Sequence, residues 1–431
     1  MKTYEATVAA IHALPRLAKT GDHERLLTLL AALGNPQTGR YVHVTGTNGK
    51  GSTSSAIAHI LEASGLTVGL FTSPFIMRFN ERIMINHQPI ADAALVEAAA
   101  TVDAALKQVR LQQPNFAVTE FEYITALAFW YFHAQHVDLA VIEVGIGGDT
   151  DSTNVIDPLV SVITSVGLDH AALLGPTLTS VARHKAGIIK PQRPVVTAAL
   201  PAEAMVEVKK RVALTGSRWL VEGQDFAAPH AQLEGWGQRF DFSRPGQAVL
   251  RHLHIPLVGA YQVNNASLAI VASQLAATAV EWPLPANAIR AGLIASTWPA
   301  RMEKISDDPL IVIDGAHNPQ GIKAMLSAAK LVFGAQRVTL IIGVLKDKDV
   351  PTMVRELESA HVRLWLVPVP DNPRASAISD YPDADRLRSF TSWQAALAAH
   401  LDEEPDEPVI IAGSLYLASA VRQTLLGAAH A

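Results

Sequence analysis

The chain has 431 residues, of which 49% are hydrophobic and 17% are charged, a composition that excludes a disordered protein. Lys plus Arg total 35 and Asp plus Glu total 40; this net charge of −5, without any run of basic residues, argues against a nucleic-acid partner. Cysteine is absent, which excludes disulfides, thiolate metal sites and cysteine nucleophiles.

The N-terminal stretch Met1–Arg25 lacks the apolar core of a signal peptide, and no segment approaches about 20 uninterrupted apolar residues. We therefore expect a cytoplasmic protein that does not bind a membrane. The length exceeds what one hydrophobic core usually organises, so two domains are expected.

In the first part of the chain, short apolar runs alternate with helix-like segments, which is typical of a parallel α/β sheet. Strands are predicted at Tyr41–Thr45, Val68–Thr72, Leu139–Val144, Val160–Val166 and Val195–Thr197. Helices are predicted at Ser52–Ser64, Glu120–Gln135 and Asn264–Ala279. Residues 205–258 are mixed and polar with short alternating runs, which predicts an antiparallel β insertion at the edge of this domain.

A second α/β series follows Arg301. Its strands are predicted at Leu310–Ile313, Val338–Ile342, Leu364–Val367 and Val409–Ala412. The fold class is therefore α/β, with a large N-terminal domain of mainly parallel sheet carrying a small β insertion, and a smaller C-terminal α/β domain. We expect the domains to cover residues 1–295 and 302–431, joined by a linker at residues 296–301.

The strongest motif lies between a predicted strand and an amphipathic helix, and reads Val44-Thr45-Gly46-Thr47-Asn48-Gly49-Lys50-Gly51-Ser52. A helix N-terminus offers N–H groups and the positive end of its dipole to phosphate, and glycines let the backbone wrap around phosphate oxygens. Lys50 would reach the β- and γ-phosphates of a nucleotide, and the Ser52 hydroxyl the metal or a phosphate. The spacing departs from G-x-x-x-x-G-K-[ST], and a purely structural glycine-rich turn is the alternative.

Three polar residues lie at or after the ends of predicted strands and are candidate ligands of Mg²⁺, which prefers oxygen donors. They are Ser73, Glu143 and His170. A carboxylate beside so apolar a strand as that of Glu143 is costly unless it is paired, which favours a cation nearby. The alternatives are a Glu143–lysine pair, a capping role for Ser73 and a packed or capping His170.

The motif Thr45–Ser52 resembles the nucleotide-binding signature of the Mur ligase superfamily, and the chain as a whole resembles the folylpolyglutamate synthase/dihydrofolate synthase family within it. The resemblance runs from Pro15-Arg16 to Gly413-Ser414-Leu415-Tyr416. It implies a P-loop ATPase-like first domain, a Rossmann-like second domain, and ATP and Mg²⁺ as cofactors. It also implies that Thr47, Asn48, Gly49, Lys50, Gly51 and Ser52 bind ATP.

The resemblance assigns further residues to the metal and to ATP. Ser73, Glu143 and His170 would bind Mg²⁺, and Lys185 would be carbamylated to support a second ion, with Lys50, His170 and Lys185 as catalytic groups. An unmodified Lys185 paired with acidic neighbours is the alternative. Asn264 would lie near the adenine, Arg301 would contact the phosphates, with a surface salt bridge as its alternative, and Asp314 would contact the ribose.

The same resemblance implies where the other substrates bind. His317 and Ser414 would bind glutamate, with loop capping as the alternative. Phe75 and Arg82 would offer an aromatic surface and a cation to a folate. Asp151, in a glycine-rich loop beside Glu143, would also bind the folate, and plain loop structure is the alternative for both stretches. Many family members carry arginine at the position of Asp149, and this departure bears on whether dihydropteroate is also a substrate.

The predicted function is that of an ATP-dependent ligase, which adds L-glutamate to the glutamate tail of reduced folates through an acyl phosphate. The enzyme is expected to act as a monomer, with a reduced folate and L-glutamate as its partners. A dihydrofolate synthase or a bifunctional enzyme is the nearest alternative. A P-loop nucleotide switch that hydrolyses ATP without ligation is an alternative of another class.

Overall fold

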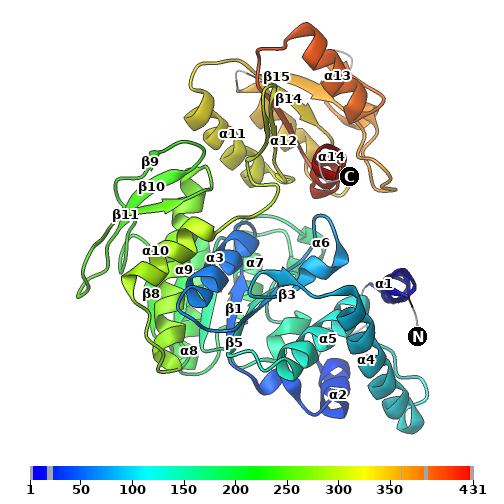
Figure 1. Ribbon diagram of the computed structural model, residues 1–431, viewed down its shortest axis with the longest axis vertical. Coiled ribbons are helices and arrows are strands. Elements are labelled where there is room, and N and C mark those ends of the chain that lie inside the picture. Colours follow the sequence, from blue (N-terminus) through cyan, green and yellow to red (C-terminus); the bar gives the residue numbers. More distant parts are fainter. Residues whose placement is uncertain (1–2, 17–22, 361, 383–386, 428–431) are drawn as a thin grey trace. The chain divides into compact units, whose positions relative to one another are not determined.

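The computed structural model describes residues 3–16, 23–360, 362–382 and 387–427 (Figure 1). The chain divides into two compact units. The first comprises Met1–Pro229, Asp241–Leu253 and Asn264–Ser296, and the second His230–Phe240, His254–Val263 and Thr297–Ala431.

An eight-stranded sheet organises the first unit, in the order β4-β3-β2-β5-β1-β6-β7-β8. Its strands are β1 (Tyr41–Thr45), β2 (Val68–Phe71), β3 (Ile83–Ile85), β4 (Gln88–Pro89), β5 (Leu139–Glu143), β6 (Val160–Ile163), β7 (Val195–Thr197) and β8 (Trp219–Val221). The six strands from β2 to β8 in this order pair in parallel, whereas β3 and β4 add an antiparallel edge. Because β1 and β5 are buried at every position, both faces of the sheet are covered.

Helices of the first unit pack on this sheet. They are α1 (Tyr4–His12), α2 (Glu24–Ala32), α3 (Lys50–Glu62), α4 (Asp92–Gln112), α5 (Glu120–Ala134), α6 (Ala171–Leu174), α7 (Leu178–Ala186), α8 (Ala202–Thr215), α9 (Ala260–Ala279) and α10 (Ala286–Ala295), with short 3₁₀ turns η1 (Pro36–Thr38), η2 (Phe79–Arg82) and η3 (Ser152–Val155). The helix α3 packs across β1, β2 and β5 and is itself covered by α10 (Figure 1). The helices α1, α2, α4 and α5 share one core with β2 and β5.

The helix α5 shows why these segments begin where they do. The Thr119 hydroxyl accepts the N–H of Glu122, and the Glu122 carboxylate accepts the N–H of Thr119, so two N–H groups at the start of the helix are satisfied. The helix is predicted correctly to within one residue at its end. The predicted helix Ser52–Ser64 in fact begins at Lys50, within the glycine-rich motif.

The predicted antiparallel insertion at residues 205–258 is wrong in its first part. Residues there form α8, and β8 then joins the main sheet in parallel with β7. Ala204 and Val208 lie one helical turn apart and are buried against α7, while Lys209 and Lys210 face solvent, and this polar face hid the helix from the sequence pattern. The small sheet contains only β9 (Gln232–Leu233), β10 (Gln238–Phe242) and β11 (Leu250–Ile255), in the order β11-β10-β9.

A six-stranded sheet organises the second unit, in the order β12-β13-β17-β14-β15-β16. Its strands are β12 (Glu303–Asp307), β13 (Leu310–Ile313), β14 (Val338–Ile342), β15 (Val362–Leu366), β16 (Arg388–Ser389) and β17 (Val409–Ala412). Its helices are α11 (Pro319–Phe333), α12 (Val350–Glu358), α13 (Trp393–Glu403) and α14 (Leu415–Gly427), with the turn η4 (Ile378–Asp380). The edge strands β12, antiparallel to β13, and β16 are not predicted from the sequence.

Across the described residues, no helix combines the length and the apolar character needed to span a bilayer.

His43 is a fully buried histidine in the middle of β1. Its ring Nε2 lies 2.8 Å from the hydroxyl of Thr153, and within the described chain its Nδ1 has no hydrogen-bonding partner. Burial, and secondarily the charge of Lys190, lower the pKa of His43 from 6.5 to about 3. His43 is therefore neutral in the folded protein at neutral pH.

This buried histidine should make the fold sensitive to acid. Between pH 6.5 and 3 the unfolded chain binds a proton at His43 that the folded chain does not. The free energy of unfolding is therefore unaffected by His43 above pH 6.5 and decreases as the pH falls from 6.5 towards 3. From pH 7 to pH 4, His43→Gln should lose about 3 kcal/mol less free energy of unfolding than the wild type. Urea unfolding at several pH values measures this, with exposed His133→Gln as the control. Equal pH dependence in wild type and His43→Gln would contradict it.

Candidate active site

The sheet of the first unit brings four chain segments to one edge. The strands β2, β5, β1 and β6 are neighbours and run in parallel, so their carboxyl ends lie together. In the register of the sheet, Glu143 lies directly beside Val44, and Ile163 beside Thr45. The glycine-rich motif, Glu143, the segment after β2 and the segment after β6 therefore meet at this edge.

The glycine-rich motif turns sharply and is supported by the segment that follows β6. The N–H of Asn48 donates to the Ser165 hydroxyl at 2.8 Å, and the carbonyl of Asn48 accepts the Thr164 hydroxyl at 2.7 Å. The Thr47 hydroxyl donates to the carbonyl of Gly167 at 3.0 Å and accepts its N–H at 2.9 Å. These bonds hold the turn in one conformation before any ligand arrives. No local feature of residues 164–167 signals this role.

Gly49 is the position where the motif requires glycine. Its φ of 86° is left-handed, and a Cβ there would lie 2.5 Å from Oδ1 of Asn265. Asn265 is buried on α9, whereas the side chain of its neighbour Asn264, which the sequence analysis assigns to the adenine, is exposed. Asn265 is thus a site residue that sequence reasoning missed.

Lys50 is the first residue of α3. Its Nζ donates to the carbonyl of Gly46 at 3.0 Å, so the ammonium group folds back over the turn. The first N–H groups of a helix have no partner within the helix, and α3 presents this end and its positive dipole to the same space. The Ser52 side chain is buried one turn into the helix. The arrangement is that of a phosphate-binding loop.

Glu143 ends β5 and is only 4% exposed. Its Oε2 accepts the main-chain N–H of Ser73 at 3.1 Å, so the structure brings these two predicted ligands together. A buried carboxylate with a neighbouring hydroxyl is an oxygen donor set that suits Mg²⁺. His170 is exposed and immediately precedes α6, in the segment that follows β6. The donors at Ser73 and Glu143 fit the ion.

Lys185 lies near the C-terminal end of α7 and is 2% exposed. Burial, and then the positive charge of Lys50, lower the pKa of Lys185 well below its usual range, while Asp169 and Asp151 act in the opposite direction. The structure therefore brings Lys185 within electrostatic reach of Lys50. A lowered pKa favours the uncharged amine, which is the form that reacts with carbon dioxide to give a carbamate.

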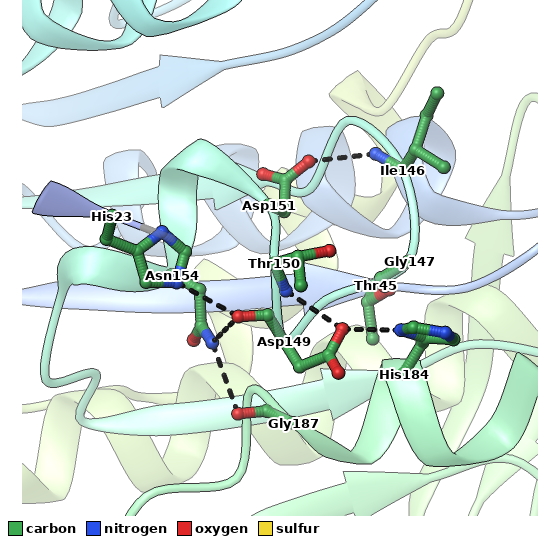
Figure 2. Close-up of polar contacts among 10 residues, drawn as sticks. All are labelled: His23, Thr45, Ile146, Gly147, Asp149, Thr150, Asp151, Asn154, His184 and Gly187. Atoms are coloured by element: carbon green, nitrogen blue, oxygen red, sulfur yellow. Dashed lines mark hydrogen bonds and ion pairs between the residues drawn. The ribbon is translucent and has the colours of Figure 1, made fainter. Parts of the chain in front are cut away.

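The loop that follows β5 is tied together by its own aspartates (Figure 2). The Asp151 carboxylate is buried and accepts the N–H of Ile146 at 2.9 Å, together with the N–H of Thr153 at 3.0 Å and its hydroxyl at 2.5 Å. Burial raises the pKa of Asp151, and these bonds act in the opposite direction. Asp151, which the sequence analysis assigns to the folate, thus shapes the loop from within.

Asp149 anchors the same loop to α7. Its carboxylate lies 2.6 Å from Nδ1 of His184, the residue before Lys185, and Figure 2 shows the two side chains pointing at each other. The carbonyl of Asp149 also lies 2.9 Å from Nε2 of His23 and accepts the side-chain amide of Asn154 at 3.1 Å. Asp149 is therefore held in place by α7, by His23 and by Asn154, while part of its side chain stays exposed.

The predicted folate stretch forms an aromatic cluster. The guanidinium of Arg82 lies over the rings of Phe75, at 5.2 Å, and Phe79, at 5.6 Å. The Glu81 carboxylate accepts main-chain N–H groups from residues 76–78 and so holds the turn that carries Phe75. Phe75 and Arg82 are half-buried, so part of this surface faces outward.

The second unit brings its predicted residues to one edge in the same way. The strands β13 and β17 are parallel neighbours with Ile313 beside Ile411, so Asp314 and His317 follow one strand and Ser414 the next. Asp314 is buried, its two oxygens accept the N–H groups of Met302 and Ala316, and burial raises its pKa while Arg301 acts against this. His317 Nδ1 lies 2.8 Å from the carbonyl of Gly315, and the Ser414 hydroxyl accepts the N–H of Tyr416 at 3.1 Å at the start of α14.

The phosphate-binding loop at the carboxyl edge of a parallel sheet defines the first unit as a nucleotide-binding domain of P-loop type. Comparison with protein families assigns both parts of the chain to the Mur ligases. Residues 44–273 match the Mur ligase middle domain, and residues 300–415 match the glutamate ligase domain of Mur ligases.

Individual relatives match this sequence over nearly the whole chain. The folylpolyglutamate synthase of Lacticaseibacillus casei is 60% identical over 98% of this chain and 99% of its own. The dihydrofolate synthase/folylpolyglutamate synthase of Bacillus subtilis is 36% identical over 93% and 94%. An FPGS–AMPPCP–folate complex superposes with a TM-score of 0.92 at 59% identity, over 99% of this chain and 100% of the other. The chain therefore belongs to the folylpolyglutamate synthase family of the Mur ligases, and the predicted resemblance and fold class are confirmed.

Proposed function

We propose that this protein is an ATP-dependent ligase that adds L-glutamate to the glutamate tail of reduced folates. The observation that carries the proposal is the phosphate-binding loop, in which Lys50 folds over Gly46 beside the buried carboxylate of Glu143. A phosphoryl transfer needs positioned charge more than a protein nucleophile, and the loop supplies that charge. The 60% identical relative is named as a folylpolyglutamate synthase.

The reaction proceeds in two steps. The terminal carboxylate of the folate attacks the γ-phosphorus of ATP, and ADP leaves, while Lys50 and the N–H groups of α3 hold the phosphates. The amine of glutamate then attacks the acyl phosphate, loses a proton and displaces phosphate. Mg²⁺, which Ser73, Glu143 and His170 would hold and carbamylated Lys185 would support, supplies neutralisation of the phosphate charge.

The remaining roles are assigned to residues of each unit. Residues 1–295 would bind ATP and the folate, the latter through Phe75, Arg82 and the loop that Asp151 shapes, and 302–431 would bind glutamate through His317 and Ser414. We also propose nucleotide contacts for Asn264 of the first unit and for Arg301 and Asp314 of the second. We also propose a monomer, because each of these sites is built within one chain, and a cytoplasmic location, because ATP and glutamate are available there.

One assay tests the function. Purified protein with ATP, Mg²⁺ and radiolabelled glutamate should form ADP and labelled folate in equal amounts when a reduced folate is present. ADP formation at the same rate without a folate would indicate a nucleotide switch and overturn the proposal. Labelling of dihydropteroate at a comparable rate would identify a bifunctional enzyme, as the name of the Bacillus subtilis relative indicates for that protein.

A further inference from the structure

A cluster of two histidines and a glutamate lies outside the site described above. His59 and Glu62 stand three residues apart on α3 and so share one face of the helix, near the end opposite to the phosphate-binding loop. His87 reaches them from the turn between β3 and β4, where its φ is 55°. One potential ligand atom from each side chain lies within 4.8 Å of the other two.

The imidazole rings of His59 and His87 are stacked face to face. Their centroids are 3.2 Å apart and their planes differ by 5°. His87 Nδ1 lies 2.8 Å from Oε2 of Glu62. The buried Nε2 of His87 makes no hydrogen bond of good geometry among the described residues, although the Ser55 carbonyl acts on the ring. Two imidazoles and a carboxylate are therefore gathered in one place, with at least one ring nitrogen poorly satisfied.

The charge state of the cluster suits a metal ion. Burial, and then the neighbouring His87, lower the pKa of His59 to about 3. Burial also lowers the pKa of His87, against the opposing effects of Glu62 and the Ser55 carbonyl. Neutral imidazole is the form that binds metals, and the burial of both rings favours that form.

We propose that His59, Glu62 and His87 bind one divalent late transition-metal ion, with Zn²⁺ as the representative. Two imidazoles and one carboxylate, with water in the fourth position, are a recurrent tetrahedral ligand set for this ion. Ligand atoms around tetrahedral Zn²⁺ lie about 3.3 Å apart, and an imidazole binds the ion in the plane of its ring, so the two stacked rings have to turn out of their parallel arrangement when the ion binds. Nitrogen donors make this site different in kind from the oxygen donors at Ser73 and Glu143.

The bound ion would link two parts of the first unit that are distant in sequence. The helix α3 carries Lys50 at its start and this cluster near its end, while the β3–β4 turn is the antiparallel edge of the sheet. Because the ion binds the folded chain, it would raise the melting temperature, by an amount that grows with the ratio of the free ion concentration to its Kd.

The test is zinc binding by the full-length protein, freed of metal and held in excess Mg²⁺. Isothermal titration with ZnCl₂ should give one ion per chain, and Co²⁺ should give visible absorption bands of a nitrogen- and oxygen-ligated ion. His59→Gln and His87→Gln should each weaken zinc binding by roughly tenfold or more and remove the Co²⁺ bands. Glu143→Gln and the exposed pair His133→Gln/His136→Gln should leave both signals unchanged.

Zinc binding of unchanged stoichiometry and affinity in His59→Gln and His87→Gln would overturn the proposal, as would an absence of binding to the wild type. If either histidine variant unfolds, Glu62→Gln decides the question, because its partly exposed side chain can lose its charge without disturbing the core. Loss of zinc affinity in that variant supports the site, and retention overturns it. None of these readouts depends on ligase turnover.

Discussion

A Lys50→Ala protein should fold normally and lose roughly 100-fold or more of its ATP-dependent turnover, with weaker binding of ATP. The reason is that Lys50 supplies the positive charge over the turn at Gly46, where the β- and γ-phosphates are proposed to lie. Alanine is a good helix former at the start of α3, and the substitution removes one hydrogen bond from the fold. Turnover is measured by labelled glutamate incorporation, ATP affinity by titration calorimetry, and folding by thermal unfolding.

The matched control for this experiment is Lys107→Ala, which removes an exposed lysine from α4. It should keep wild-type turnover and ATP affinity. Normal ATP affinity together with full product formation in Lys50→Ala would show that the glycine-rich turn does not hold the nucleotide, and the proposed function would fall with it.

Glu143→Gln should be nearly inactive at ordinary Mg²⁺ concentrations, with a loss of roughly 100-fold or more. Glutamine has the same shape and can still accept the N–H of Ser73, but it removes the buried negative charge that would hold the ion. We therefore expect the Mg²⁺ concentration for half-maximal activity to rise, and the thermal stabilisation by ATP with Mg²⁺ to shrink. Both quantities are read from titrations of Mg²⁺ at saturating ATP.

Glu122→Gln is the control for burial and charge, since Glu122 is also 4% exposed. That carboxylate caps α5 and pairs with Arg25 at 2.8 Å, so its loss should lower the melting temperature and leave the Mg²⁺ dependence unchanged. An unaltered Mg²⁺ dependence in Glu143→Gln would place the ion elsewhere and leave the buried carboxylate with a structural role.

Much of the chemistry was accessible from local sequence. The strand, glycine-rich turn and helix around Lys50 were predicted because each follows from backbone stereochemistry and from the spacing of apolar residues. Glu143 was predicted as a strand-end carboxylate because the four apolar residues before it define the strand. The family, the fold class and the ligase assignment are confirmed by the comparisons, while the roles of the individual site residues stay predictions.

Other parts of the site could not be predicted, because the residues that meet there lie far apart in the sequence. Ser165 supports the phosphate-binding turn from 117 residues away, and Asn265 packs on Gly49 from the helix α9. Nothing in the residues around them differs from an ordinary loop or helix. The helix α8 was missed because its polar face outweighs the two buried apolar residues, Ala204 and Val208, that pack against α7.

The sequence alone thus determined the elements and the kind of chemistry, because periodicity and turn residues act over a few neighbouring positions. The tertiary structure decided which strand ends and loops lie next to one another. The strand order β2-β5-β1-β6 places Ser73, Glu143, the Lys50 turn and residues 164–170 at one edge, and the β3–β4 turn places His87 against His59. Strand order is set by how whole faces pack together, and that is a property of the complete chain and not of any one segment.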